Sequence, residues 1–230
     1  MKSQLTQSQR AVREMVRDFV HREILPVARE RDLIPDPVEA YPWDLVKKAS
    51  KLGLRTLALP EGLGGGGGDF LTLLIVCEEL AYGDLGFAES FDTTLSWSHV
   101  ISELMDEAQR ARFLPSFLED DTFMLANALG EPNAGSDNLL PNPDPRAGVA
   151  TAARRDGDEW VLNGRKQFIS NGNLAKLLFV MTRTDPARSV IDGCTLFAVP
   201  AGTPGLTTGR VEDKMGQRLG NNAELIFEDC

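Results

Sequence analysis

Cysteine and histidine are scarce in this sequence of 230 residues, which contains three cysteines and two histidines. The cysteines are far apart and odd in number, so they do not form the regular framework of a small secreted disulfide protein. Neither histidine lies near a cysteine, which argues against a zinc site. We therefore expect a reduced, cytoplasmic protein with buried or incidental thiols and no metal centre.

Long apolar runs and basic residues are also in short supply. No stretch of about 18 apolar residues occurs, which argues against a membrane-spanning helix, and the N-terminus lacks the apolar segment of a signal peptide. Lysine and arginine total 24 against 34 aspartates and glutamates, which gives a formal net charge of −10. Because nucleic-acid binding needs a basic surface, this charge argues against it, and more weakly against docking on anionic lipid.

The first part of the chain, residues 1–120, has the periodicity of helices. Apolar residues recur at three- and four-residue steps from Val12 to Val27, which predicts an amphipathic helix with Thr6 as its N-cap. Further helices are predicted at residues 42–51, 70–82, 87–105 and 106–118. With 42% apolar residues, a chain of this length can bury a sizeable core in one or two domains.

Residues 121–230 have a different sequence pattern, with short apolar runs separated by glycine, proline and acidic residues. Strands are predicted at residues 160–162, 166–169, 177–182, 194–199 and 224–227, and Asn163 with Gly164 predicts a hairpin turn. The proline-rich segment 140–146 predicts a loop. The expected fold class is therefore α+β, with an all-α helical domain at 1–120 and a β-barrel or sandwich domain at 121–230.

The glycine-rich segment 62–68 formally matches the dinucleotide-binding pattern G-x-G-x-x-G. That pattern requires a βαβ context, whereas the predicted flanks are helical and any run of glycines fits it. No Lys-Ser/Thr pair follows, which excludes a P-loop. We interpret the segment as a flexible connector between helices.

Two stretches of the second half combine turn-forming residues with hydroxyl groups. Residues 131–137 could direct backbone N–H groups and a hydroxyl into a pocket, where they suit anionic or carbonyl oxygens. Residues 166–172 predict a strand that ends in a hydroxyl and an Asn-Gly turn. Taken alone, the first stretch is a turn and the second a hairpin, so composition leaves a binding role open.

Taken together and in this order, these segments resemble the acyl-CoA dehydrogenase family, over about residues 6–229. In the helical half the resemblance is carried by Leu59-Pro60-Glu61, the glycine run and Cys77-Glu78-Glu79-Leu80-Ala81-Tyr82-Gly83. In the β half it is carried by Glu131-Pro132, Ala134-Gly135-Ser136-Asp137, Leu162-Asn163-Gly164-Arg165-Lys166, Phe168-Ile169-Ser170-Asn171-Gly172 and Glu212-Asp213-Lys214-Met215-Gly216-Gln217-Arg218. The ordered set is more specific than any one segment.

The resemblance implies a fold and a reaction. Family members have an N-terminal helical domain, a middle β domain and a C-terminal four-helix domain, with FAD between the last two. A base removes the α-proton of an acyl-CoA thioester and the flavin takes a hydride from the β-carbon, which leaves a 2-enoyl-CoA. Electrons pass to an electron-transfer flavoprotein. The resemblance also implies a homo-oligomer, as a dimer or tetramer.

The resemblance assigns cofactor-binding residues but no catalytic residue. The flavin-facing residues would be Asn127, Leu129, Gly130, Gly135, Ser136, Phe168, Ile169 and Ser170. Ser136 would contact both the cofactor and the acyl-CoA substrate, Phe168 would lie against the flavin ring, and the Ser170 hydroxyl would lie near flavin N5. Such groups bind the ring and tune its electronics.

Four of these positions depart from the family pattern. Phe168 and Ser170 stand where tryptophan and threonine are usual, and they keep the residue type. Gly130 stands where a threonine hydroxyl commonly binds the flavin, and Asn127 stands where an aromatic residue is common. The last two changes leave the flavin affinity or chemistry open to question.

The catalytic glutamate of the family belongs to the C-terminal helical domain, at positions that would fall after Cys230. Glu131 matches a motif position, but we interpret it as a structural loop carboxylate. The chain is therefore expected to be a fragment of a dehydrogenase, a subunit of a split enzyme completed by a chain that carries the C-terminal domain, or a non-catalytic relative that binds acyl-CoA or a partner protein. A flavin oxidase or monooxygenase of the same superfamily is a further alternative.

Overall fold

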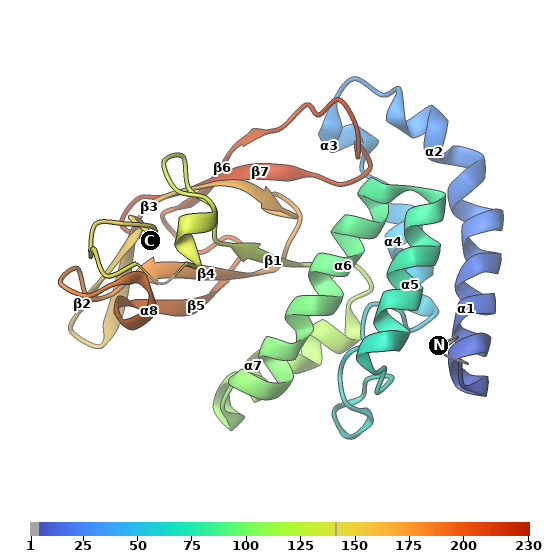
Figure 1. Ribbon diagram of the computed structural model, residues 1–230, viewed down its shortest axis with the longest axis horizontal. Helices are drawn as coiled ribbons and strands as arrows, with labels where there is room; N and C mark the ends of the chain where they lie inside the picture. Colours follow the sequence, from blue (N-terminus) through green and yellow to red (C-terminus); the bar gives the residue numbers. More distant parts are fainter. Residues whose placement is uncertain (1–4, 141) are drawn as a thin grey trace. The chain divides into compact units, whose positions relative to one another are not determined.

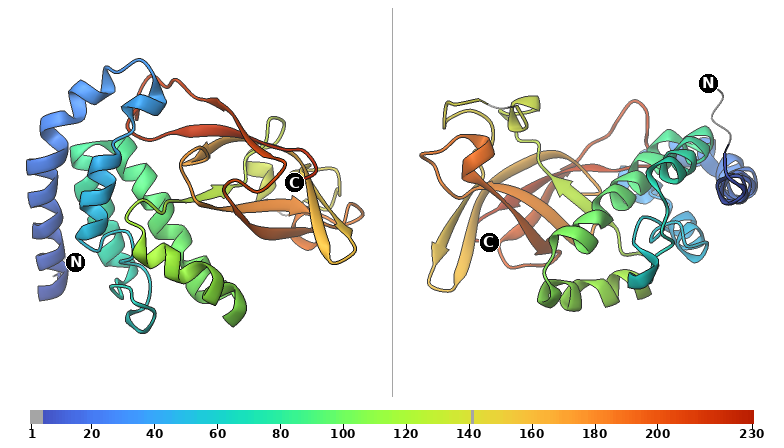
Figure 2. Two further views of the ribbon diagram at one scale, coloured as in Figure 1. Left: turned by 180° about the vertical axis from the view of Figure 1, so that it is seen from behind. Right: turned by 60° about the horizontal axis from the view of Figure 1, so that its bottom comes forward.

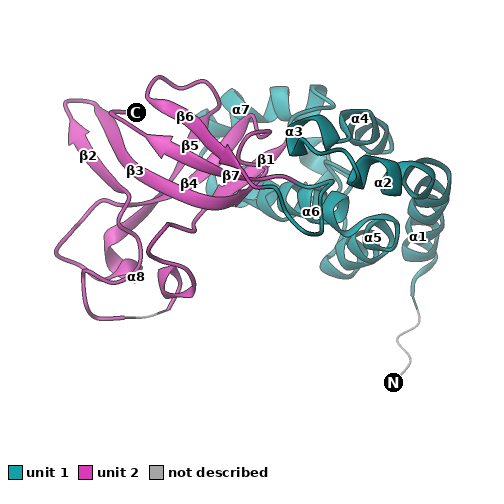
Figure 3. Ribbon diagram, turned by 90° about the horizontal axis from the view of Figure 1, so that it is seen from above, with its two compact units in different colours: residues 1–123, 213–220 teal, residues 124–212, 221–230 magenta. Residues whose placement is uncertain are grey.

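The computed structural model describes residues 5–140 and 142–230 (Figure 1). The chain forms two compact units, shown in different colours in Figure 3. The first contains the chain up to Phe123 together with Asp213–Gly220, and the second contains Met124–Glu212 and Asn221–Cys230. The first is helical and the second is built on a β-sheet, which confirms the predicted α+β fold class.

The helical unit is a chain of α-helices with two π-helical turns and one 3₁₀ turn among its described residues. Its elements are α1 (Gln7–Phe19), η1 (Val20–Ile24), α2 (Leu25–Asp32), α3 (Pro37–Ala40), α4 (Trp43–Lys51), η2 (Glu61–Leu63), α5 (Phe70–Gly83), α6 (Leu85–His99), η3 (Val100–Leu104) and α7 (Glu107–Glu119). Thr6 is the predicted N-cap of α1: its side chain accepts from the Gln9 backbone, and the Gln9 side chain accepts from the Thr6 backbone. No helix of the described residues has the length and apolar character needed to span a bilayer.

Helix α5 packs between α1 and α6 (Figure 1). It buries apolar residues such as Leu73, Val76 and Leu80. At its last residue, Gly83, a Cβ atom would lie only 2.8 Å from Cγ1 of Val20. The glycine that ends the Cys77–Gly83 motif therefore permits a close contact between α5 and η1.

The glycine-rich segment is a packed loop, so its interpretation as a flexible connector is wrong. Four successive glycines, residues 65–68, donate backbone hydrogen bonds of 2.8–3.2 Å to carbonyl oxygens of residues 56–60. A Cβ atom at Gly65 would lie 2.2 Å from the Leu59 carbonyl oxygen. Glycine is needed here because two backbone segments approach each other too closely for a side chain.

The segment Asp213–Gly220, predicted as part of the β half, groups with the helical unit. Arg218 donates to the carbonyl oxygens of Asp32 and Ile34, at 2.8 and 2.7 Å. A Cβ atom at Gly86 would lie 2.6 Å from the Gln217 carbonyl. The segment is therefore held by a close backbone contact and by the hydrogen bonds of one arginine. Such interactions need no regular spacing of apolar residues, so the sequence pattern does not predict them.

The β unit is one curled sheet of seven strands (Figure 2). The strands are β1 (Leu125–Ala128), β2 (Ala152–Asp156), β3 (Glu159–Ser170), β4 (Leu177–Arg183), β5 (Cys194–Pro200), β6 (Leu206–Val211) and β7 (Asn222–Phe227), with short helices η4 (Ser136–Asn138) and α8 (Val190–Gly193). Their order is β1-β4-β2-β3-β7-β6, with β5 paired to β4. The core side chains include Ala126, Leu162, Ile169, Leu178, Val180, Leu225 and Phe227.

Neither predicted Asn-Gly turn closes a hairpin. Strand β3 runs straight through Asn163 and Gly164, and Asn163 pairs with Ala152 of β2. Gly164 has φ of 146°, and a Cβ atom there would lie 2.7 Å from Cα of Thr151, so this glycine serves a close approach within the sheet. The turn between β2 and β3 instead lies at residues 157–158. Asn171 and Gly172 follow β3, which pairs with β2 and β7 and not with the next strand, β4.

Candidate functional site

The loop after β1 and the end of β3 contact each other, although about 35 residues separate them in the sequence. The Gln167 backbone N–H donates to the Gly130 carbonyl oxygen at 2.9 Å. The adjacent Lys166 ammonium donates to the Leu129 carbonyl oxygen at 3.2 Å. The structure thus brings together the two segments to which the sequence assigned a cofactor-binding role.

Backbone and side-chain hydrogen bonds hold the loop 129–138 in one conformation. Glu131 and Ala134 form a backbone bridge. The buried Asn138 donates from Nδ2 to the carbonyl oxygens of Leu129 and Ala134, at 3.0 and 3.3 Å. Gly135 and Ser136 lie exposed at the tip, where Ser136 begins the single turn η4. A fixed loop with an exposed hydroxyl suits a ligand that approaches from solvent.

The end of β3 presents an aromatic ring in an unusual backbone conformation. Phe168 has φ of 60° and is 62% exposed. A β-bulge lies between Lys166 and Ile169. A bulky residue with positive φ is an outlier that costs conformational energy, and such outliers cluster at functional sites.

The other predicted residues of this strand end differ in what they can offer a ligand. Ile169 is buried in the sheet core, so only its backbone is available. The half-buried Ser170 accepts a hydrogen bond at its hydroxyl from Asn222 Nδ2, at 3.0 Å.

The remaining predicted strand residue, Asn127, lies in β1. It is half-buried and alternates with the buried core residues Ala126 and Ala128, so it faces away from that core.

Asn171 connects the end of β3 to β1. Its side chain is fully buried, and Nδ2 donates to the Leu125 carbonyl oxygen at 3.0 Å. It has φ of 61°, a conformation that asparagine tolerates better than most residues. The Asn-Gly pair that suggested a hairpin turn therefore anchors the strand that carries Phe168 and Ser170.

A buried ion pair lies beneath the loop. Lys166 Nζ lies 2.8 Å from Glu131 Oε1, and the two side chains are 0% and 4% exposed. The Glu131 carboxylate also accepts the backbone N–H groups of Ala150 and Thr151, at 2.7 and 2.9 Å. These contacts agree with the interpretation of Glu131 as a structural loop carboxylate.

Opposing effects set the pKa of Glu131. Burial disfavours the charged form, but the hydrogen bonds from Lys166, Ala150 and Thr151 outweigh it and hold the pKa of Glu131 below its usual value. Burial lowers the pKa of Lys166, and Glu131 opposes this change. At neutral pH, Glu131 is therefore an ionised acceptor for all of its donors.

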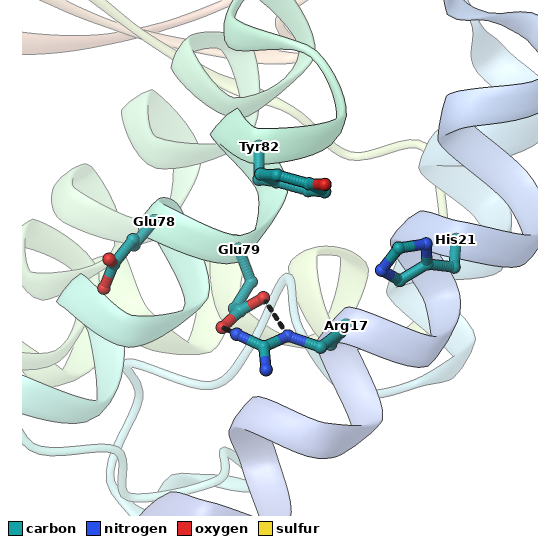
Figure 4. Close-up of a pocket in the computed structure, with 5 residues that line it drawn as sticks. All are labelled: Arg17, His21, Glu78, Glu79 and Tyr82. Atoms are coloured by element: carbon teal, nitrogen blue, oxygen red, sulfur yellow. Dashed lines mark hydrogen bonds and ion pairs between the residues drawn. The ribbon is translucent and has the colours of Figure 1, made fainter.

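A hollow of about 380 Å³ lies in the helical unit and is lined by Arg17, His21, Glu78, Glu79 and Tyr82 (Figure 4). Arg17 donates to both carboxylate oxygens of Glu79, at 2.9 and 2.5 Å, and Glu79 is buried. Figure 4 shows Glu78 on the far side of this pair. Because the buried carboxylate is already neutralised by Arg17, we interpret the cluster as a link between α1 and α5.

Two sequence models of one family match the chain in order. The acyl-CoA dehydrogenase N-terminal domain matches residues 6–121, and the acyl-CoA dehydrogenase middle domain matches residues 126–230. The chain belongs to the acyl-CoA dehydrogenase family. The resemblance inferred from the ordered motifs is thereby confirmed.

Individual members of the family agree with this assignment. The mitochondrial short-chain specific acyl-CoA dehydrogenase of Rattus norvegicus is 36% identical over 230 residues, which cover 99% of this chain and 52% of the relative. The structure of butyryl-CoA dehydrogenase from Megasphaera elsdenii gives a TM-score of 0.86 at 34% identity and covers 100% of this chain and 57% of that chain. A glutaryl-CoA dehydrogenase from Mycobacterium smegmatis in complex with FADH2 gives 0.82 at 32% identity, covering 98% and 53%. The chain spans about half the length of the curated relatives it matches.

Sequence reasoning missed three residues that hold the candidate site of this acyl-CoA dehydrogenase family member in place. Lys166, Asn138 and Arg183 are buried and polar, and none of them was a candidate. For Lys166 a signal existed: it lies four residues after the core residue Leu162, on the inward face of a strand, where a charged residue needs a partner. Asn138 and Arg183 bind loop carbonyls, and their sequence context carries no comparable signal.

The depressed pKa of Glu131 predicts acid sensitivity in this unit. A carboxyl with a lower pKa in the folded state stabilises the protein above the unfolded-state pKa, and this contribution is lost as the pH falls through the folded-state pKa. The unfolding free energy of Glu131→Gln should therefore lie well below that of the unsubstituted protein at pH 7. This difference in unfolding free energy should shrink below about pH 4. Urea unfolding over a pH series measures the difference, with Glu159→Gln, at an exposed position, as the control. A difference that stays constant down to low pH would contradict the assignment.

Proposed function

We propose that this chain forms one wall of the FAD and acyl-CoA site of an acyl-CoA dehydrogenase, which converts an acyl-CoA thioester into a 2-enoyl-CoA. The observation that supports this most directly is Phe168, an exposed aromatic ring held at positive φ beside the loop 129–136. Maintaining such a conformation costs energy, and binding a planar ring would explain why it is kept. The similarity to a glutaryl-CoA dehydrogenase that holds FADH2 supports the same cofactor.

The residues of the site fit a flavin in kind. The Phe168 face suits the apolar part of a planar ring system, and the Ser170 hydroxyl and the loop backbone supply polar partners at its edge. Ser136 is exposed, and we propose that its hydroxyl contacts both cofactor and substrate. When bound, FAD supplies the hydride acceptor. This chain's residues bind and orient the ring, and none of them is proposed as the base.

Flavin binding is the first test of this proposal. The purified protein is titrated with FAD, flavin fluorescence and absorbance are followed, and butyryl-CoA is then added without oxygen. We expect saturable flavin binding and a change in the flavin spectrum on addition of the thioester. Protein that takes up no flavin on reconstitution would remove the proposal. If flavin binds and is reduced, oxygen consumption compared with reduction of electron-transfer flavoprotein separates a dehydrogenase from an oxidase of the same superfamily.

One observation favours a second function, non-catalytic binding of acyl-CoA. Where the family commonly carries a flavin-binding threonine, a Cβ atom at Gly130 would lie 2.9 Å from the Gln167 carbonyl oxygen, so the backbone leaves no room for that side chain. A site that has lost this hydroxyl could retain the thioester ligand without the flavin. Equilibrium binding of butyryl-CoA in the absence of FAD, with no turnover, is the result that this alternative expects.

The proposed dehydrogenase requires further partners. An electron-transfer flavoprotein would accept the electrons, and the protein would act in the cytoplasm as a dimer or tetramer, or together with a chain that carries the C-terminal domain. The support for these partners is the family resemblance. Light scattering, and reduction of electron-transfer flavoprotein by the acyl-CoA-loaded protein, test them.

A further inference from the structure

We propose that the buried Lys166–Glu131 ion pair is a positioning device for the candidate flavin site. Its role is to fix the loop 129–136 against the end of β3, so that the loop backbone and the Phe168 ring face the same ligand. The inference rests on the proposed function for the identity of that ligand. The positioning itself is a property of the β unit and can be measured without flavin.

Three consecutive residues of β3 carry the argument. Lys166 donates to the Leu129 carbonyl oxygen at 3.2 Å, and Gln167 donates from its backbone to the Gly130 carbonyl oxygen at 2.9 Å. The next residue, Phe168, points its ring outward at positive φ. The ammonium group that holds the loop thus lies only two residues before the exposed aromatic side chain in the same strand.

Glu131 fixes the other side of the ammonium group. Its carboxylate accepts from Lys166 at 2.8 Å and from the backbone N–H groups of Ala150 and Thr151, at 2.7 and 2.9 Å. One carboxylate and one ammonium group therefore connect the loop, strand β3 and the segment that precedes β2. Bulk solvent hardly reaches the pair, because the side chains are 0% and 4% exposed.

Arg183 of β4 holds the segment that delivers these two N–H groups. Its buried guanidinium donates to the carbonyl oxygens of Ala147, Val149 and Arg188, at 2.7, 3.1 and 2.7 Å. Residues 147–149 lie directly before Ala150, so the donors to Glu131 are themselves fixed. Such a chain of supporting hydrogen bonds is what holds a binding site to a defined geometry.

A purely structural role would not need this chemistry. Taking two charges out of water is costly, and well-packed hydrophobic residues often give equal or greater stability. A hydrophobic pair cannot provide the directed hydrogen bond from Lys166 to the Leu129 carbonyl oxygen. The pair is therefore best explained by the geometry that it imposes on the loop.

The test separates folding from positioning with three variants: Lys166→Met, the double change Glu131→Gln with Lys166→Met, and Arg165→Met. Arg165 is the matched control, because it lies next to Lys166 in β3 and forms a looser ion pair, in which Glu224 is 3.5 Å away and the two side chains are 60% and 24% exposed. Thermal unfolding reports stability. Hydrogen–deuterium exchange of residues 127–136 reports how strongly the loop amides are protected, and FAD titration reports binding at the candidate site.

We expect Lys166→Met to unfold at a lower temperature, because it leaves the Glu131 carboxylate buried without its counter-ion. The double variant should recover much of this loss and still exchange faster in the loop, with FAD bound about tenfold more weakly, the loss of one charge-assisted hydrogen bond. Arg165→Met should match the unsubstituted protein in all three measurements.

The outcomes are distinct. A double variant that recovers stability, loop protection and FAD affinity together would overturn the inference, since any buried pair would then suffice. If loop exchange rises in the double variant while its FAD affinity is unchanged, the pair positions the loop but not the flavin site, and the inference fails. If the unsubstituted protein binds no FAD and the loop still loses protection, the proposed function fails while the positioning of the loop is supported.

Discussion

Replacing Gly65 by alanine is expected to lower the free energy of unfolding by about 3 kcal/mol, the upper range for forcing extra volume into a packed region. An added Cβ atom would lie 2.2 Å from the carbonyl oxygen and 2.3 Å from Cβ of Leu59. Backbone cannot yield as a flexible side chain does. In addition, the Gly65, Gly66 and Gly67 N–H groups donate to carbonyl oxygens of residues 56–60, so a shift at one glycine disturbs its neighbours.

Gly62 provides a matched control within the same glycine run. Nothing lies within 4 Å of a Cβ atom built there, and its φ is not positive. Gly62→Ala should change the unfolding free energy by less than about 1 kcal/mol. Urea unfolding followed by far-ultraviolet circular dichroism compares the two variants. Equal, small effects at both positions would mean that the loop is loose and that the contacts at Gly65 do not constrain it.

The glycine run also illustrates which part of the fold was open to sequence reasoning. The helix at residues 70–82 could be predicted because the segment is a long, mainly apolar stretch, typical of a buried helix, and α5 covers Phe70–Gly83. A glycine carries no such signal: the same residue serves a flexible linker, a phosphate-binding turn or a close backbone contact. The choice depends on what lies opposite, here Leu59 and Leu57, and that is a tertiary fact.

The same limit explains the two Asn-Gly errors in the β unit. An Asn-Gly pair between apolar runs is a strong local hairpin signal. The Asn163-Gly164 pair instead lies inside β3. Glycine is needed at position 164 because Thr151 of the neighbouring segment approaches too closely for a side chain. Strands β1, β2 and β6 were missed for a related reason. They are short or polar and are stabilised by the neighbours that they pair with, not by their own apolar content.

The candidate site was predictable in its parts but not in its construction. Motif order suggested the loop and the end of β3, and the structure brings the two together through Gln167 and Gly130. The partners of the buried Lys166 and Arg183 lie 37 and 34 residues away in the sequence, and that of Asn138 lies nine residues away, so no local pattern identifies them. Nor does local sequence show that the strand end would place Phe168 at positive φ.

That conformation leads to the second large prediction: Phe168→Ala and Phe168→Gly should separate ligand binding from stability. Both variants remove the ring and should weaken FAD binding about tenfold, since an aromatic contact contributes about 1 kcal/mol beyond buried area. Only glycine also relieves the strain. A side chain at φ of 60° costs about 1–2 kcal/mol relative to a relaxed backbone, so the glycine variant should be the more stable of the two by about 1 kcal/mol.

FAD titration and urea unfolding of the flavin-free protein measure the two effects separately. Trp160→Ala is the control for removing an exposed aromatic side chain, because Trp160 lies near the start of β3 and its ring meets Phe197 edge to face, with the centroids 5.5 Å apart. Trp160→Ala should leave FAD affinity unchanged.

If Phe168→Gly were less stable than Phe168→Ala and also bound FAD as tightly as the unsubstituted protein, the positive φ would serve folding and not a ligand. If instead Phe168→Gly is more stable than Phe168→Ala while both variants bind FAD more weakly than the unsubstituted protein, the strain at the end of β3 is maintained for binding.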